Sequence, residues 1–149
     1  MSIEQLRIVP FSNLLVGKSH LRMHEFLQLV RTALCMQRVP EHLLFGDVMT
    51  LSCWLQQHRE GVMVYDGLLG HVVGHAIAEY GRAPDHEGVR CTMVSVHLRG
   101  VPPQIHTRVY RELASSCGVR LSQSPSTMVD LILPDGRVLE YLFKFRVTS

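Results

Sequence analysis

The sequence predicts a mixed α/β fold in which helices flank a largely antiparallel central sheet. Two observations support this prediction: apolar residues recur at helical spacing in three segments, and β-prone runs alternate with turn-forming residues. Together they predict the order β-α-α-β-β-β-α-β-β-β. The chain has 149 residues, of which 46% are hydrophobic and 19% charged. This composition can form a packed core, and the absence of linkers and repeats predicts one domain over residues 1–149.

The N-terminal part is predicted to hold one strand and two helices. Residues 6–10 alternate between apolar and polar positions, which predicts a short strand followed by a turn. From Ser19 the apolar residues change to helical spacing, and Pro40 prevents that helix from continuing. Residues 45–58 show a second helical pattern, and Gly61 is expected to end it in the left-handed conformation.

Three strands are predicted between residues 62 and 98. Residues 62–65 are β-prone, and Asp66-Gly67 is a typical hairpin turn. Residues 71–80 are rich in Val, Ile and Ala and form the returning strand. A loop over residues 82–88 then leads to a third strand over residues 89–98.

A third helix is predicted after the third of these strands. Pro102 and Pro103 suit its first turn, and Gly118 is expected to end it. Its apolar stripe comprises Ile105, Val109, Leu113 and Cys117. Residues 119–121 are then expected to form a short strand.

The last two strands are predicted at residues 128–133 and 137–147, joined by the turn Pro134-Asp135-Gly136. The apolar residues of the second strand alternate with charged ones, and they are Leu139, Tyr141, Phe143, Phe145 and Val147. Two interpretations of this face stay open. It closes the core of the domain, or it pairs at a sheet edge with a partner protein or a second protomer in a homodimer.

Charge and hydropathy exclude several classes of protein. The net charge is only +2 and no basic run occurs, so we expect no nucleic acid partner. No segment reaches the ~18 apolar residues of a membrane span, and the N-terminus lacks a signal-peptide pattern, so we expect a cytoplasmic protein without membrane contact. The four cysteines are widely spaced among apolar residues, which favours reduced, buried thiols over a metal site.

The segment VSVHLRGVPPQIHTRVYR, residues 94–111, gives the chain a resemblance to a known family. A strand, the pair Arg99-Gly100 and an amphipathic helix follow one another as in the Gcn5-related N-acetyltransferase superfamily. The predicted order of elements is similar to that family over nearly the whole chain. The resemblance implies the acyl-CoA N-acyltransferase fold, with backbone N–H groups of this loop holding the pyrophosphate of acetyl-CoA.

This chain departs from the family pattern at two places, which makes it a degenerate member. Pro102 and Pro103 replace a glycine-rich turn and cannot donate N–H bonds. The short stretch between Gly118 and Met128 leaves no room for the family's next helix and contains no Tyr to protonate a thiolate. We therefore assign that role to neither Tyr110 nor Tyr141.

The resemblance implies a cofactor site and a base. Arg99 would supply charge-assisted bonds to phosphate, and the cofactor-binding residues would be Val94, Val96, Arg99, Gly100 and Val101. The catalytic candidates are His97, whose unperturbed pKa lies near neutrality, and Glu79. The simpler interpretation of His97 is a polar residue where a strand ends.

Other chemistry-bearing residues have simpler interpretations. Asp85, His86 and Glu87 are candidate bases near the proposed cleft, although Asp85 and Glu87 are more simply explained as solvated loop charges. His71 and His75 would lie ~13 Å apart on a strand and would not share one metal ion without a bulge.

Two functions stay open. The first is transfer of an acetyl group from acetyl-CoA to an amine acceptor. The second is a non-catalytic protein of the same fold, such as an accessory protein of a virus or mobile element, that acts through protein–protein contacts.

Overall fold

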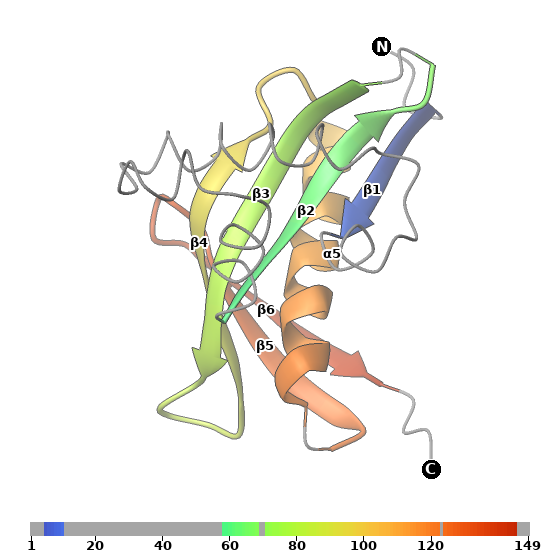
Figure 1. Ribbon diagram of the computed structural model, residues 1–149. Helices are drawn as coiled ribbons and strands as arrows, with labels where there is room; N and C mark the ends of the chain where they lie inside the picture. The colour runs from blue at the N-terminus through green and yellow to red at the C-terminus, as the bar shows by residue number, and fades with distance from the viewer. Residues whose placement is uncertain (1–4, 11–57, 69–70, 123, 146–149) are drawn as a thin grey trace, which may run out of the picture.

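The computed structural model describes residues 5–10, 58–68, 71–122 and 124–145 (Figure 1). The strands are β1 (Leu6–Pro10), β2 (Arg59–Asp66), β3 (His71–Arg82), β4 (Gly88–His97), β5 (Ser126–Ile132) and β6 (Val138–Lys144), and the helix is α5 (Pro103–Leu121). The first two predicted helices lie outside the described residues, except for His58, which lies in a turn with a φ of 59°.

The strands form one six-stranded sheet in the order β1-β2-β3-β4-β5-β6. Every neighbouring pair is antiparallel except β4 and β5, which are parallel. A parallel pair needs a long crossover connection, and α5 is that connection. The predicted mixed α/β class with a largely antiparallel sheet is confirmed.

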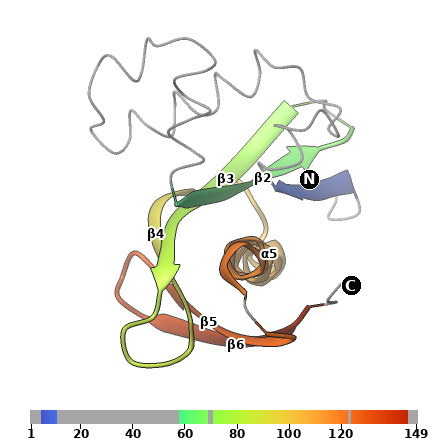
Figure 2. The ribbon, with the colours of Figure 1, turned by 60° about the horizontal axis from the view of Figure 1, so that its bottom comes forward.

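The sheet curls around α5, which contacts all six strands (Figure 2). The predicted apolar stripe of this helix is buried against the sheet, as Leu113, with none of its surface exposed, illustrates. Val62 and Val64 of β2 and Val129 and Leu131 of β5 belong to the same core. Burial of a side chain such as Leu113 contributes about 1.5–3 kcal/mol of transfer free energy.

The predicted end of this helix at Gly118 is wrong, and so is the short strand over residues 119–121. Helix α5 continues through Gly118 to Leu121. A Cβ on Gly118 would lie 2.7 Å from Cγ2 of Val129, so this glycine permits close approach of helix and sheet rather than ending the helix. In the last turn, Nε of Arg120 lies 3.2 Å from Oε2 of the buried Glu60 on β2.

Gly61 does not end a helix either. It lies inside β2, where it pairs with Ile77 of β3. The residue with positive φ before this strand is His58. The strand also begins earlier than predicted, at Arg59.

The C-terminal hairpin is confirmed, with Gly136 of its turn at a φ of +90°. Its second strand is shorter than predicted and ends at Lys144, and Val147 lies outside the described residues. The aromatic face of β6 points toward α5: Phe143 is buried in the core, and Cζ of Arg111 lies 5.4 Å from the centre of its ring. Tyr141 and Phe145 pack against the same core. The aromatic side chains therefore help to close the protein's own core, which is the first of the two interpretations of this face.

Candidate functional site

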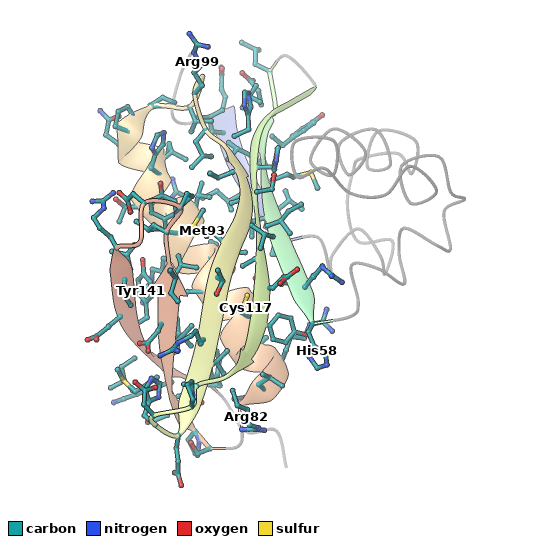
Figure 3. All side chains as sticks on the ribbon, turned by 90° about the vertical axis from the view of Figure 1, so that its left-hand side faces the viewer. His58, Arg82, Met93, Arg99, Cys117 and Tyr141 are labelled. Carbon is teal, nitrogen blue, oxygen red and sulfur yellow. The ribbon has the colours of Figure 1, made fainter. Side chains whose placement is uncertain are left out.

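The connection between β4 and α5 has the predicted strand–loop–helix arrangement, and Arg99 lies at this end of the sheet (Figure 3). The Val101 N–H donates to the Leu98 carbonyl at 3.0 Å, and the Ile105 N–H donates to the Pro102 carbonyl at 2.9 Å. Val101 and Leu98 are buried, whereas Arg99 and Gly100 are exposed. The loop is therefore anchored by its apolar residues and presents Arg99 and Gly100 to solvent.

The two prolines at the helix start leave few donors for an anion. Helix α5 has Pro102 as its N-cap without a side-chain cap, and Pro103 is its first residue. The Val101 N–H already bonds Leu98, whereas the N–H groups of Arg99 and Gly100 bond no backbone acceptor among the described residues. Val101 thus differs from its predicted role, because its N–H belongs to the turn and its side chain to the core.

Strands β4 and β5 pair only over part of their length. Their parallel pairing ends at Thr92 and Ile132, and β4 continues to His97. Beyond Thr92 no described strand pairs with this edge of β4. The sheet is therefore open along residues 93–97, next to the loop that carries Arg99.

A β-bulge lies within the open part of β4. Ile77 of β3 pairs with Ser95 and Ala78 pairs with Met93, so Val94 is the extra residue. The partly buried Val96 pairs with Ala76 and packs against the core. Val94 is therefore left without a partner in the β3–β4 register, while the Val96 side chain supports the core.

His97 is exposed at the end of β4 and stands opposite the buried His75 of β3. Their rings are stacked with centroids 6.1 Å apart. His75 Nε2 and Ser95 Oγ are hydrogen-bonded at 3.0 Å. Burial, with a smaller contribution from the nearby His97, lowers the pKa of His75 to about 4. His75 is therefore neutral at pH 7, and His97 is the solvent-facing imidazole of the pair.

Glu79 lies on the same face of the sheet but far from His97. It is four residues beyond His75 along β3, which corresponds to ~13 Å. Its Oε1 lies 3.3 Å from Nε of Arg59, its partner in the β2–β3 register. The structure therefore does not bring the two predicted catalytic residues together.

The loop with Asp85, His86 and Glu87 lies between β3 and β4, at the end of β4 away from Arg99. His86 Nε2 lies 2.8 Å from Oδ2 of Asp130 on β5, and Asp85 pairs with Arg90 at 3.2 Å. His86 and Glu87 line a cavity of about 470 Å³, to which Arg82 also contributes. Figure 3 shows Arg82 at the end of the molecule opposite Arg99, so these three residues belong to a separate region.

Cys91 on β4 and Cys117 on α5 are free thiols buried in the core. A hydrogen bond with Cys91 and burial raise the pKa of the Cys117 thiol well above its usual value. The Cys117 thiol is therefore protonated at pH 7. Cys35 and Cys53 lie outside the described residues.

The described part of the chain holds no group of three His, Cys, Asp or Glu side chains arranged to bind a metal ion. His75 is instead bonded to Ser95, on a strand that carries a bulge at Val73 between His71 and His75. Within the same residues, no helix is both long and apolar enough to cross a membrane.

Sequence reasoning missed two parts of this site. The bond between His75 and Ser95 depends on the β3–β4 register, for which the sequence holds no local signal. Gly74 gave a usable signal, because a glycine inside a strand pattern marks close backbone approach. A Cβ there would lie 2.8 Å from the His97 carbonyl oxygen and 2.9 Å from Cγ2 of Val101.

No protein-family model matches this chain, and no curated protein matches it. The chain is similar to the crystal structure of an acetyltransferase from Trypanosoma brucei, with a TM-score of 0.48 and 10% identity over 76% of this chain and 77% of that one. It is also similar to a predicted acetyltransferase from Clostridium acetobutylicum crystallised with acetyl-CoA, with a TM-score of 0.49 and 11% identity over 89% of this chain and 84% of that one. Independently of these structures, the order of the described elements, with α5 between the parallel strands β4 and β5, agrees with the layout that the sequence resemblance implies.

Proposed function

We propose that this protein transfers an acyl group, with acetyl-CoA as donor, to an amine. The observation that carries the proposal is the open edge of β4 over residues 93–97. This edge offers unpaired backbone groups to an extended, amide-containing arm such as the pantetheine of an acyl-CoA. It ends at His97 and leads directly into the loop with Arg99.

The residues of this site offer more to the pantetheine arm of acetyl-CoA than to its pyrophosphate. The backbone of Val94 and Val96 provides the edge for the pantetheine amides. The pyrophosphate would be held by the Arg99 guanidinium and the Gly100 N–H, since Pro102 and Pro103 have no N–H to donate. When bound, the donor supplies an activated thioester, and the chain's own residues supply position and proton transfer.

His97 is the proposed base. An amine must lose its ammonium proton before it attacks a carbonyl, and an exposed imidazole near neutral pH can accept that proton. The neutral His75 behind it fixes the ring by stacking without adding a positive charge. Glu79 is not part of this proposal, because it lies far along β3 and pairs with Arg59.

Titration calorimetry with acetyl-CoA tests binding. Arg99→Ala should weaken binding by about 1.5–3 kcal/mol, the contribution of a charged hydrogen bond. Arg82→Ala removes an exposed arginine at the opposite end of the molecule and should leave binding unchanged. Replacing Pro102 and Pro103 together by glycine should restore N–H donors and tighten binding.

Release of free coenzyme A in the presence of polyamines or lysine peptides tests transfer. His97→Gln should lower the turnover number by about 10²–10⁴-fold while acetyl-CoA still binds. Folded wild-type protein that binds no acetyl-CoA at millimolar concentration would overturn the proposal. That result would favour the non-catalytic function, which the two prolines of the loop already support.

A further inference from the structure

We infer that the outer edge of β6 is a self-association surface that pairs with β6 of a second copy of this chain, in a register centred on Leu142. This inference concerns the backbone edge and the outer face of the hairpin, not its aromatic inner face. It is independent of the proposed acyl transfer.

The outer face of the β5–β6 hairpin carries exposed apolar side chains. Leu142 is 59% exposed, Val138 50% and Met128 36%. Met128 and Leu142 stand directly opposite each other, as do Ile132 and Val138. Such a cluster of large apolar residues at a sheet edge favours association with another chain.

The backbone of β6 is arranged for such pairing. β6 is the last strand of the sheet, and no described strand pairs with its outer side. The Phe145 N–H donates to the Pro125 carbonyl and the Leu133 N–H to the Arg137 carbonyl, so the odd-numbered residues of β6 bond β5. In an antiparallel ladder the alternate residues point their N–H and C=O groups to the other side. Leu142 and its even-numbered neighbours therefore present free donors and acceptors.

The charges on β6 select one register. With the two-fold axis at Leu142, Glu140 of each copy stands opposite Lys144 of the other, and Leu142 stands opposite itself. With the axis at Glu140, two carboxylates would face each other. With the axis at Tyr141, Lys144 would face the apolar Val138. Of these three registers, only the first pairs opposite charges, and this self-complementarity is why we select a second copy as the occupant.

The same register joins the side-chain rows of the two sheets. Met128 pairs with Leu142 within one chain, so an apolar row would run from Met128 through both Leu142 side chains to the second Met128. The residues around Leu142 would form about six new backbone hydrogen bonds, two for each of the three opposed pairs. The contact area of one edge strand is small, so the dimer should dissociate on dilution.

Sedimentation velocity over a range of protein concentrations tests the inference. We expect a concentration-dependent monomer–dimer equilibrium that Leu142→Lys weakens by at least about tenfold. Leu68→Lys is the matched control, because Leu68 is also exposed and lies in the turn after β2. A wild-type chain that stays monomeric to millimolar concentration, or a dimer unaffected by Leu142→Lys, would overturn the inference.

A charge-reversal set tests the register. Glu140→Lys and Lys144→Glu should each weaken the dimer, and the double variant should restore it to within about threefold of wild type. A double variant as weak as the single ones would overturn the register. Circular dichroism of each variant separates dimer loss from unfolding.

A cross-link keeps the test independent of these variants. Directly opposed Cα atoms of a hydrogen-bonded antiparallel pair lie ~5.5 Å apart, within the range that a disulfide spans. Leu142→Cys should therefore form a covalent dimer under mild oxidation faster than Leu68→Cys does. Equal rates for the two variants would contradict the symmetric contact at Leu142.

Discussion

Gly74 of β3 and Val101 of the loop after β4 approach so closely that a Cβ on Gly74 would lie 2.9 Å from Cγ2 of Val101. The same Cβ would lie 2.8 Å from the carbonyl oxygen of His97. A backbone oxygen cannot move aside as the end of a flexible side chain can. The position of the loop that carries Arg99 therefore depends on a residue without a side chain on the neighbouring strand.

Gly74→Ala should lower the free energy of unfolding by about 1–3 kcal/mol, because overpacking forces the loop away from β3. Gly81→Ala is the matched control: it lies on the same strand, and no atom lies within 4 Å of its added Cβ. Urea denaturation of both variants measures the difference. Equal stability of the two would contradict the close contact.

His75 should make stability depend on pH between about 6.5 and 4. Its pKa is lowered to about 4 in the folded protein from 6.5 in the unfolded chain. Above pH 6.5 the ring is neutral in both states and has no effect. As the pH falls through this window, the unfolded chain binds a proton that the folded protein does not, so stability falls by about 3 kcal/mol in all. Below pH 4 both states are protonated and the loss is complete.

Denaturation of wild type and His75→Gln at several pH values measures this contribution. The variant cannot take up a proton at this position, so its stability should fall less steeply over the same window. The difference between the two curves removes the contribution of the other titrating groups. Parallel curves would show that His75 titrates normally.

Leu113→Ala should lower the free energy of unfolding by about 2–5 kcal/mol, because it leaves a cavity between α5 and the sheet. Glu112→Ala changes the exposed neighbouring residue on the same helix and should shift stability by less than about 0.5 kcal/mol. Thermal or urea denaturation separates the two. An unchanged midpoint for Leu113→Ala would mean that this helix face is not packed.

The ion pair between Glu60 and Arg120 should link the start of β2 to the end of α5. Glu60 is buried, and its Oε2 lies 3.2 Å from Arg120 Nε. Arg120→Gln should lower stability by about 1–3 kcal/mol, since the buried Glu60 carboxyl loses this partner. In a double-mutant cycle, Arg120→Gln should lower the free energy of unfolding much less in the Glu60→Gln variant than in the wild type. Additive effects would show that the two side chains do not interact.

The elements with a strong local pattern were predictable from the sequence. The hairpin turn at Gly136 and the buried stripe through Leu113 both follow from residue type and spacing alone. Gly118 shows where this reasoning fails. A glycine that ends a helix and a helical glycine that packs closely against a strand look alike in the local sequence. Only the contact with Val129 shows that Gly118 has the second role.

The candidate site was predictable only in outline. The strand before Arg99 and the helix after it follow from the sequence, but the hydrogen bond that engages Val101 is a property of the folded turn. The separation of Glu79 from His97 depends on the register between β3 and β4. Register is set by contacts between residues far apart in the chain, which a single sequence does not reveal.

The parallel junction of β4 and β5 also bears on the order of folding. β2, β3 and β4 pair through short connections, as do β5 and β6, whereas Gly88 meets Met128 only after α5 has crossed the sheet. Closing that long loop carries a larger entropic penalty than closing a hairpin, so we expect the two halves to form before they pair. Native-state hydrogen exchange should therefore find smaller opening free energies for amides that bond β4 to β5 than for those between β2 and β3. The open edge of β4 begins after Thr92, where the pairing with β5 ends. A molecule bound along this edge would therefore stabilise the contact between the β2–β4 half and the β5–β6 half of the sheet.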